Sequence, residues 1–169
     1  RRQLDELLSV RTGQCGIVYC RRRKDTEELA EYFAGRGHRC AAFHACLPAA
    51  TKAEALAAFM QDRLDLVFAT VAFGMGIDRP DVRFVIHAAM PSSIEAYVQE
   101  AGRAGRDGAP ADCILLYSGE DIRTAIYFID KEDPEPVRRR SLEQALWGMR
   151  SYTRSPLCRH RQIAEHFGQ

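Results

Sequence analysis

The densest cluster of residues suited to chemistry in this sequence combines two arginines with three glycines. Arg103 and Arg106 stand three positions apart, between glycines at positions 102, 105 and 108. Glycine lets a backbone turn sharply and approach a ligand closely. A guanidinium group stays charged and can bind two phosphate oxygens at once. The cluster predicts contact with a polyphosphate. The alternative is a surface turn with solvated arginines.

Other polar residues extend this prediction. Gln99 precedes Arg103 by four positions, a spacing that predicts a shared helix face. A second glycine-rich loop occupies residues 74–78, and Thr70 stands just ahead of it. Taken alone, the loop favours a plain turn and Thr70 favours a cap at a strand end.

Short apolar runs separated by helical patterns must position these residues. The runs do not alternate between polar and apolar residues, which is typical of strands buried on both faces of a parallel sheet. Candidate strands occupy residues 16–20, 40–43, 66–69, 84–87 and 113–117. Helix starts are predicted from capping boxes at Asp25 with Glu28, Thr51 with Glu54, and Ser92 with Glu95. The order predicts an α/β fold with right-handed crossovers.

Ligands of open parallel sheets bind beyond the carboxyl ends of the strands. Arg22 follows the first predicted strand, His44 the second and Thr70 the third. We expect Arg103 and Arg106 at the same rim, which would then carry the chemistry of a phosphate site. For His44 the alternative is a strand-end histidine whose hydrogen bonds are satisfied within the protein.

Composition narrows the class of protein. The chain has 169 residues and a net charge of +1, which allows one globular domain plus a short appendage. No apolar run approaches the roughly 20 residues of a membrane span, and no leader-like segment begins the chain. Six scattered cysteines form no CxxC pair, which indicates a reducing compartment and hence the cytoplasm.

A change in composition at residues 131–136 predicts a boundary, because two prolines stand there among charged residues. From Val137 onward the sequence has seven arginines and only two glutamates. This basic segment indicates either a nucleic-acid contact or a solvated helix face.

The sequence has no GxxxxGK[ST] segment to cradle nucleotide phosphates, and no acidic pair that indicates a magnesium site. A nucleotide bound here would therefore need its cradle and metal from another domain. A finger arginine that reaches a neighbouring domain's nucleotide is a known arrangement.

Residues 69–78 and 99–108, with Ile17-Val18-Tyr19-Cys20, closely resemble the RecQ family of superfamily 2 helicases. The resemblance implies an ATP-dependent helicase that moves 3′ to 5′ on DNA and has two RecA-like domains followed by a zinc-binding subdomain. It implies a RecA-like three-layer fold with a mostly parallel sheet in residues 1–130, the second motor domain. Residues 131–169 would be a short helical appendage, the truncated start of the zinc-binding subdomain.

The resemblance also implies roles for individual residues. Arg106 is the expected arginine finger, Arg103 reaches the triphosphate, and Gln99 couples nucleotide state to domain closure. Gly76 and Asp78 belong to a loop near the nucleotide, with Asp78 at the ribose. The residues expected along the single-stranded DNA track are Tyr19, Cys20, Arg22, His44 and Thr70.

The implied cofactors are ATP and Mg²⁺, held mainly by the first RecA-like domain of the same protein, and Zn²⁺. Cys158 matches the first zinc cysteine, and the other three ligands would lie past Gln169, so the site here is incomplete. His160 is an alternative ligand. The implied partner is DNA, with no membrane, in the cytoplasm or at the nucleoid of a bacterium.

Two positions depart from the family pattern. Cys46 stands where glycine is common, so a turn with positive φ there would be strained. Arg22 stands where serine is common, and it could contact a phosphate or be solvated. Two further functions stay open: a non-enzymatic module that binds DNA or a partner, and an RNA-directed helicase of the same superfamily.

Overall fold

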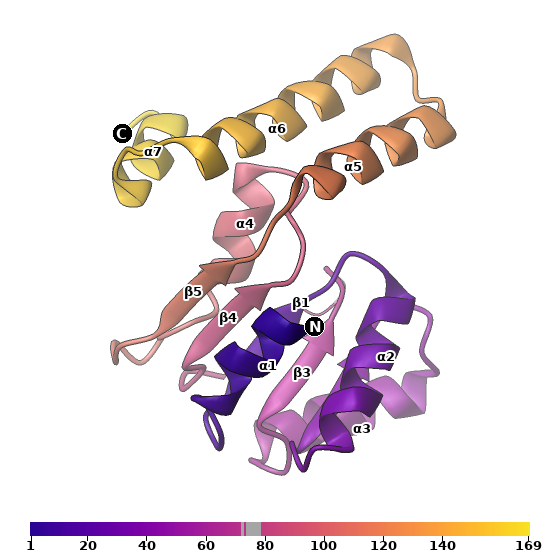
Figure 1. The fold of residues 1–169 in the computed structure, drawn as a ribbon, viewed down its shortest axis with the longest axis vertical. Helices are drawn as coiled ribbons and strands as arrows, with labels where there is room; N and C mark the ends of the chain where they lie inside the picture. Colours follow the sequence, from indigo (N-terminus) through magenta and orange to yellow (C-terminus); the bar gives the residue numbers. More distant parts are fainter. Residues whose placement is uncertain (72, 74–78) are drawn as a thin grey trace. The chain divides into compact units, whose positions relative to one another are not determined.

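The computed structural model describes residues 1–71, 73 and 79–169 (Figure 1). The strands are β1 Gly16–Tyr19, β2 Cys40–Phe43, β3 Leu66–Ala69, β4 Phe84–His87 and β5 Asp112–Leu115. The helices are α1 Arg2–Ser9, α2 Arg23–Ala34, α3 Ala49–Met60, α4 Ile94–Ala101, α5 Gly119–Glu132, α6 Pro136–Arg154 and α7 Arg159–His166.

The chain forms two compact units. The first holds residues 1–89 and 100–116, and the second holds residues 90–99 and 117–169. The division falls within α4 and again at the end of β5. The predicted boundary near residues 131–136 lies inside the second unit, at the connection between α5 and α6, so the domain assignment itself stays a prediction.

All five strands of the first unit are parallel, in the order β2-β3-β1-β4-β5. This confirms the prediction of an α/β fold with a parallel sheet. The last paired row of the sheet runs through Phe43, Ala69, Tyr19, His87 and Leu115. The strand ends are therefore level, and the residues that follow them share one edge of the sheet.

Apolar side chains on the two faces of the sheet form separate cores. Leu8 of α1 and Phe33 of α2 pack with Val18 and Phe68 on one face. Phe59 of α3 packs with residues such as Ile17 on the other. Helices on both faces make the three layers that the family resemblance implied, and burial of these large side chains is the main source of stability.

Each predicted helix start is displaced by one to three residues. Helix α2 begins at Arg23, and its N-cap is Arg22; Asp25 is the N3 residue that completes the capping box. Helix α3 begins at Ala49, so Thr51 lies inside it. For α4 the side chain of Ser93, not Ser92, accepts a hydrogen bond from the amide of Ala96 at 3.1 Å. Ser, Thr and Asp are common at several positions of a first turn, which makes the cap itself ambiguous from sequence.

The second unit is helical. Tyr97 of α4 and Tyr152 of α6 are both buried, with ring centroids 5.5 Å apart. His166 of α7 lies 2.6 Å from the carboxylate of Glu95. In the described part of the chain, no helix is both long and apolar enough to cross a membrane.

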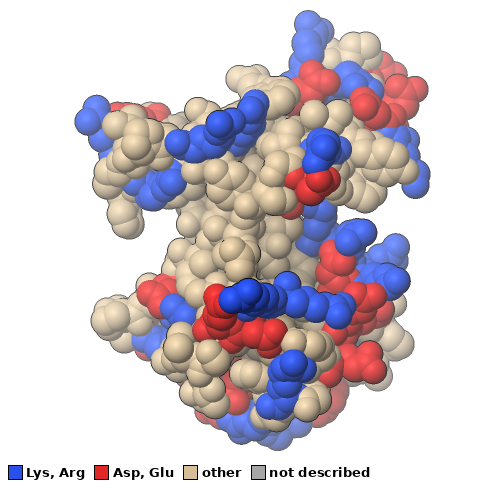
Figure 2. All heavy atoms as spheres, in the orientation of Figure 1, with Lys and Arg blue, Asp and Glu red and all other residues tan. Residues whose placement is uncertain are grey.

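Charge is mixed over the surface. Figure 2 shows Lys and Arg side chains interspersed with Asp and Glu on the face it draws. With a net charge of only +1, any binding of an anionic partner must depend on local groups rather than on the overall charge.

Candidate functional site

The two arginines of the motif lie in a series of turns, which we call the arginine turn (residues 102–108). Helix α4 ends at Ala101, and Arg103 follows it in a turn. The prediction that Gln99 and Arg103 share a helix face is therefore wrong. The glycines explain this early end, because glycine weakens a helix and favours turns. Gln99 is exposed in the last turn of α4 and belongs to the second compact unit.

Backbone hydrogen bonds tie the arginine turn to the segment before β4. The amide of Gly105 donates to Val82 O at 2.9 Å, and the amide of Asp107 donates to Pro80 O at 3.3 Å. Gly105 has a φ of +64°, and a Cβ there would lie 2.9 Å from the carbonyl oxygen of Ala109. Glycine at this position is thus required by both backbone conformation and space.

An ion pair supports the same attachment. Arg83 lies 2.6 Å from the carboxylate of Asp107, which also accepts a hydrogen bond from the amide of Ala109 at 3.0 Å. The hydrogen bond from Arg83 lowers the pKa of Asp107 below its ordinary value. The carboxylate is thus charged at neutral pH and holds the C-terminal end of the arginine turn.

The position of the arginine turn corrects a prediction. Its second half is attached through Gly105 and Asp107 to Val82 and Pro80, which precede β4, so this half lies toward the amino ends of the strands. Arg103, at its start, lies beside Tyr19, the last residue of β1. We expected it at the carboxyl rim beside Thr70. A crossover helix must bring the chain back to the edge where the next parallel strand begins, so the exit of α4 has to lie at the opposite edge.

Three buried residues lie close to the start of the arginine turn. Nε2 of His87 is 2.8 Å from Oε2 of Glu100, and the side chains are 1% and 11% exposed. The ring of Tyr19 stacks on that of His87 with centroids 5.4 Å apart, and its hydroxyl donates to Phe73 O at 2.9 Å. Burial raises the pKa of Tyr19, and the charge of nearby Arg103 lowers it in part. The phenol is thus a neutral donor.

Arg103 and Arg106 differ in their surroundings. Arg106 is exposed, and its Nε donates to the carbonyl of Gly102 at 3.3 Å. Arg103 is half-buried, and its Nε is buried without a hydrogen-bond partner among the residues that the structure describes. A buried donor without a partner is costly, so Arg103 is suited to receive an acceptor from a ligand.

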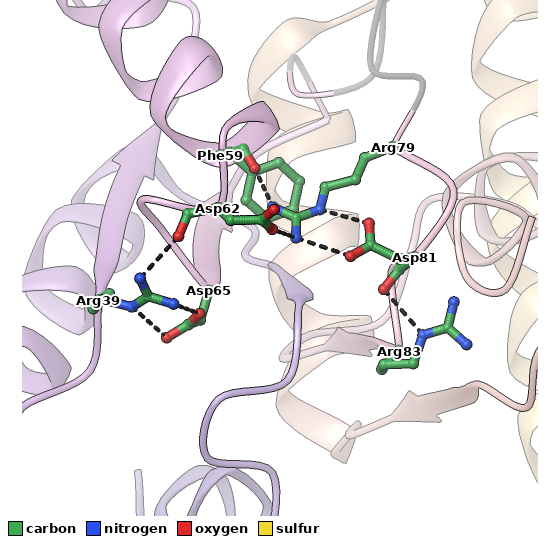
Figure 3. A network of polar contacts seen from close by, with 7 residues as sticks. All are labelled: Arg39, Phe59, Asp62, Asp65, Arg79, Asp81 and Arg83. Carbon is green, nitrogen blue, oxygen red and sulfur yellow. Dashed lines mark hydrogen bonds and ion pairs between the residues drawn. The ribbon is translucent and has the colours of Figure 1, made fainter. Parts of the chain in front are cut away.

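A third arginine holds the end of the loop that follows β3. Arg79 is 6% exposed and its guanidinium pairs with Asp62 and with Asp81, at 2.8 Å to the latter (Figure 3). It also donates to the carbonyl of Phe59 and lies over the ring of that residue. These contacts attach residue 79 to the C-terminal end of α3.

The residues predicted to follow the strands at the carboxyl edge are mostly buried. Cys20 is 7% exposed, and burial raises the pKa of its thiol to about 12. His44 is 3% exposed, and its Nε2 lies 2.9 Å from the carboxylate of Glu27 on α2. Its Nδ1 is buried without a hydrogen-bond partner among the described residues, so the alternative of a histidine satisfied within the protein holds for one ring nitrogen only. Thr70 is half-buried, and its amide donates to Phe43 O at 3.1 Å.

Arg22 is the exposed member of this set. Its guanidinium bonds the carboxylate of Asp25 with two contacts of 3.1 Å at the start of α2. With Tyr19 and Cys20 buried, Arg22 is the residue of the β1 exit whose side chain is most accessible to a phosphate. The contacts of all five predicted positions with DNA stay predictions.

Other predicted residues need separate mention. Gly76 and Asp78 lie outside the described residues. Cys46 is exposed and is not among the non-glycine residues with positive φ, which in the described part of the chain are Asp62 and Asp133. The expected strain at Cys46 is therefore wrong, because the turn after β2 does not use the left-handed conformation there.

Cys158 is exposed at the N-cap of α7. Within residues 1–71, 73 and 79–169, no group of three or more His, Cys, Asp or Glu side chains is arranged to hold a metal. Zinc of the structural kind needs four ligands, so Cys158 and His160 do not fit a zinc ion by themselves.

Sequence reasoning missed His87, Glu100 and Arg79. Glu100 stands inside the arginine motif, next to Gln99, and nothing in the local sequence distinguishes it from a solvated helix residue. His87 is the last residue of an apolar strand. A polar residue at the end of a strand that is predicted to be buried on both faces is a signal that the sequence contains. Nothing in the local pattern distinguishes Arg79 from a solvated arginine, because its partners lie up to 20 residues away.

Comparison with known proteins places this geometry in context. Residues 1–108, which include the whole arginine turn, match the family described as "Helicase conserved C-terminal domain". The chain is 37% identical over 167 residues to "ATP-dependent DNA helicase RecQ" of Haemophilus influenzae, covering 99% of this chain and 27% of the relative. It is 38% identical over 167 residues to "RecQ-like DNA helicase blm-1" of Caenorhabditis elegans, covering 98% and 17%.

A solved structure agrees with the fold. A DEAD box protein from Methanococcus jannaschii superposes with a TM-score of 0.64 at 26% identity, over 79% of this chain and 37% of that protein. The predicted RecA-like fold and the resemblance to RecQ helicases are confirmed. The chain spans about a quarter of the length of the curated relatives that it matches first.

Proposed function

Because the chain belongs to the family of helicase conserved C-terminal domains, we propose that it is the C-terminal motor lobe of an ATP-dependent 3′–5′ DNA helicase. In this proposal the arginine turn acts on a nucleotide whose phosphate cradle and Mg²⁺ are held by the first RecA-like domain of the same protein. The observation that carries the proposal is the attachment of the turn to Pro80, Val82 and Arg83, which presents Arg106 on a fixed backbone.

Arg106 is assigned the role of arginine finger. It is exposed, whereas Arg103 is half-buried beside Tyr19. An exposed guanidinium can reach a phosphate across a domain cleft, and such a finger is worth about 10³-fold or more in turnover. Arg103, with its unpartnered Nε among the described residues, is assigned a contact to the same triphosphate. Gln99 and the loop residues Gly76 and Asp78 keep the roles that the family resemblance implies.

DNA is the proposed partner, with Arg22 as the exposed contact near the end of β1. The protein names of the relatives support DNA over RNA, since both are called DNA helicases. An intracellular location follows from the proposed function. Zinc binding through Cys158 would need ligands from outside the described residues.

The test uses the full-length protein with the substitution Arg106→Ala. DNA-stimulated ATP turnover should fall by about a thousandfold, because the finger stabilises charge only in the transition state. ATP affinity should change little. Arg2→Ala is the matched control, because Arg2 is an arginine of the same unit with a 93% exposed side chain. Near-normal turnover of the Arg106 variant would refute the finger assignment.

A further inference from the structure

The basic segment after Val137 is not used by the proposed ATP site. Of its seven arginines, five bond to carboxylates or to backbone carbonyls. Arg138, Arg139 and Arg161 pair with carboxylates. Arg140 and Arg159 donate to backbone carbonyls. These five are thus engaged in contacts within the second unit. The remaining two, Arg150 and Arg154, need a different explanation.

Arg150 and Arg154 line a surface groove of about 390 Å³ on α6, together with Trp147, Ser151 and Ser155. Trp147, Arg150, Ser151 and Arg154 follow one another at helical spacing, so they form one stripe along the helix, and Ser155 is its C-cap. The opposite side of α6 is buried through Leu146, Met149, Tyr152 and Thr153. Because that side is buried, the stripe faces the solvent. We call the groove that these residues line the Trp147 groove.

The chemistry of the Trp147 groove is cationic and aromatic. The guanidinium of Arg150 lies 5.0 Å from the centroid of the Trp147 ring, and the tryptophan is 44% exposed. No acidic residue lines the groove, and in the described part of the chain neither Arg150 nor Arg154 has a carboxylate within ion-pair distance. An exposed aromatic ring beside two arginines without acidic counter-charges offers a stacking face and positive charge together, which are groups suited to an anionic, aromatic partner.

Single-stranded nucleic acid has the matching chemistry. Proteins that bind it combine positive charges along the phosphodiester backbone with aromatic rings on which bases stack. Arg150 and Arg154 are four residues apart, about 6 Å along a helix axis, so they can contact neighbouring phosphates of one strand. Trp147 then lies one turn away, where its exposed ring can receive a base, and the hydroxyls of Ser151 and Ser155 can donate to phosphate oxygens.

We propose that the Trp147 groove is a binding site for single-stranded DNA, with a base stacked on Trp147 and phosphates bound by Arg150 and Arg154. The choice of DNA over RNA rests on the proposed function. An acidic peptide shares the negative charge but lacks a planar base, and it would leave the tryptophan face unused.

Affinity of the full-length protein for a fluorescein-labelled oligothymidylate is measured without nucleotide, over a range of salt concentrations. Trp147→Ala should weaken binding about tenfold, and Trp147→Phe should retain most of the affinity because it keeps a stacking face. Arg150→Ala with Arg154→Ala should reduce the slope of log K against log salt by about 1.4, because each single-strand phosphate contact contributes about 0.7. Unchanged affinity and slope in these variants would overturn the proposal.

Matched controls come from the same unit. Tyr127 is a 59% exposed aromatic residue of α5, and Arg140 is an exposed arginine near the start of α6. Tyr127→Ala and Arg140→Ala should leave affinity and salt slope unchanged, and losses of the same size there would overturn the assignment to the groove. Tighter binding of oligouridylate, or equal competition by polyglutamate, would overturn the choice of DNA. The measurement involves no ATP hydrolysis, so a failed finger assignment would not affect it.

Discussion

The imidazole of His87 lies 2.8 Å from the carboxylate of Glu100, three residues ahead of Arg103, and both side chains are buried. Glu100 thus fixes the last turn of α4 to the end of β4 from inside the first unit. The arginine turn starts two residues later. Its first arginine, Arg103, therefore follows directly on a buried contact between helix and sheet.

Glu100→Ala should lower the free energy of unfolding by about 3 kcal/mol, because removal of one partner leaves a buried polar group without its hydrogen bond. Glu100→Gln should recover much of this loss, since its amide oxygen still accepts from Nε2 of His87. Urea unfolding of the variants measures both effects. Equal losses for alanine and glutamine would show that the hydrogen bond contributes little.

Gly105→Ala should both destabilise the protein and reduce DNA-stimulated ATP turnover. A left-handed alanine costs about 1–2 kcal/mol, and its Cβ would press on Ala109 O, which displaces the turn that carries Arg106. Gly37→Ala is the control. Gly37 has a φ of +87° but open space around it and lies away from the arginine turn, so stability should fall while turnover persists. Turnover assays at saturating DNA compare the two variants.

The pair of Arg83 and Asp107 should make stability depend on acid pH. The pKa of Asp107 is lowered in the folded protein below its ordinary value of 3.8. A lowered folded-state pKa adds stability above the unfolded pKa, and this is lost as pH falls through the folded pKa. Asp107→Asn should therefore destabilise at about pH 6, and this destabilisation should shrink as the pH falls below 3.8. Denaturant unfolding at each pH measures the difference in stability between the variant and the natural protein. A difference that stays constant over this pH range would contradict the assignment.

Arg79→Ala should destabilise the first unit by about 2 kcal/mol, since the carbonyl of Phe59 loses its donor and the ring of Phe59 loses its cover. Arg79→Lys should recover only part, because lysine cannot reproduce the forked contacts to Asp62 and Asp81. Thermal melting of the two variants gives the comparison. A lysine variant as stable as the natural protein would show that charge alone suffices.

Thiol labelling should separate the cysteines by burial. Burial raises the pKa of Cys15 and Cys20 to about 12, whereas Cys46 and Cys158 are exposed. A thiol with that pKa has about a thousandfold less thiolate near pH 8 than an ordinary cysteine, and its access is blocked as well. Iodoacetamide followed by peptide mapping should find Cys46 and Cys158 modified first. Early modification of Cys20 would show that the end of β1 opens to solvent.

The strands were predictable to within one or two residues at their ends because each contains a short apolar run, as in Leu66–Ala69. The arginine turn was recognisable from its residue types alone. Its location was not, because that depends on where the crossover through α4 ends. The burial of Tyr19, Cys20 and His44 likewise depends on what α2 and the segment at Phe73 place over the strand ends. Such pairings join residues far apart in the chain, and local patterns do not contain them.

The segment from Arg79 to Arg83 has two attachments, one to the end of α3 through Arg79 and one to the arginine turn through Pro80, Val82 and Arg83. A chimaera that exchanges only the arginine turn between two such proteins would therefore separate the turn from the segment to which it is attached. Grafts should carry residues 59–62, 79–83 and 102–108 as one cassette. Over evolutionary time, substitutions in these three stretches are expected to compensate one another.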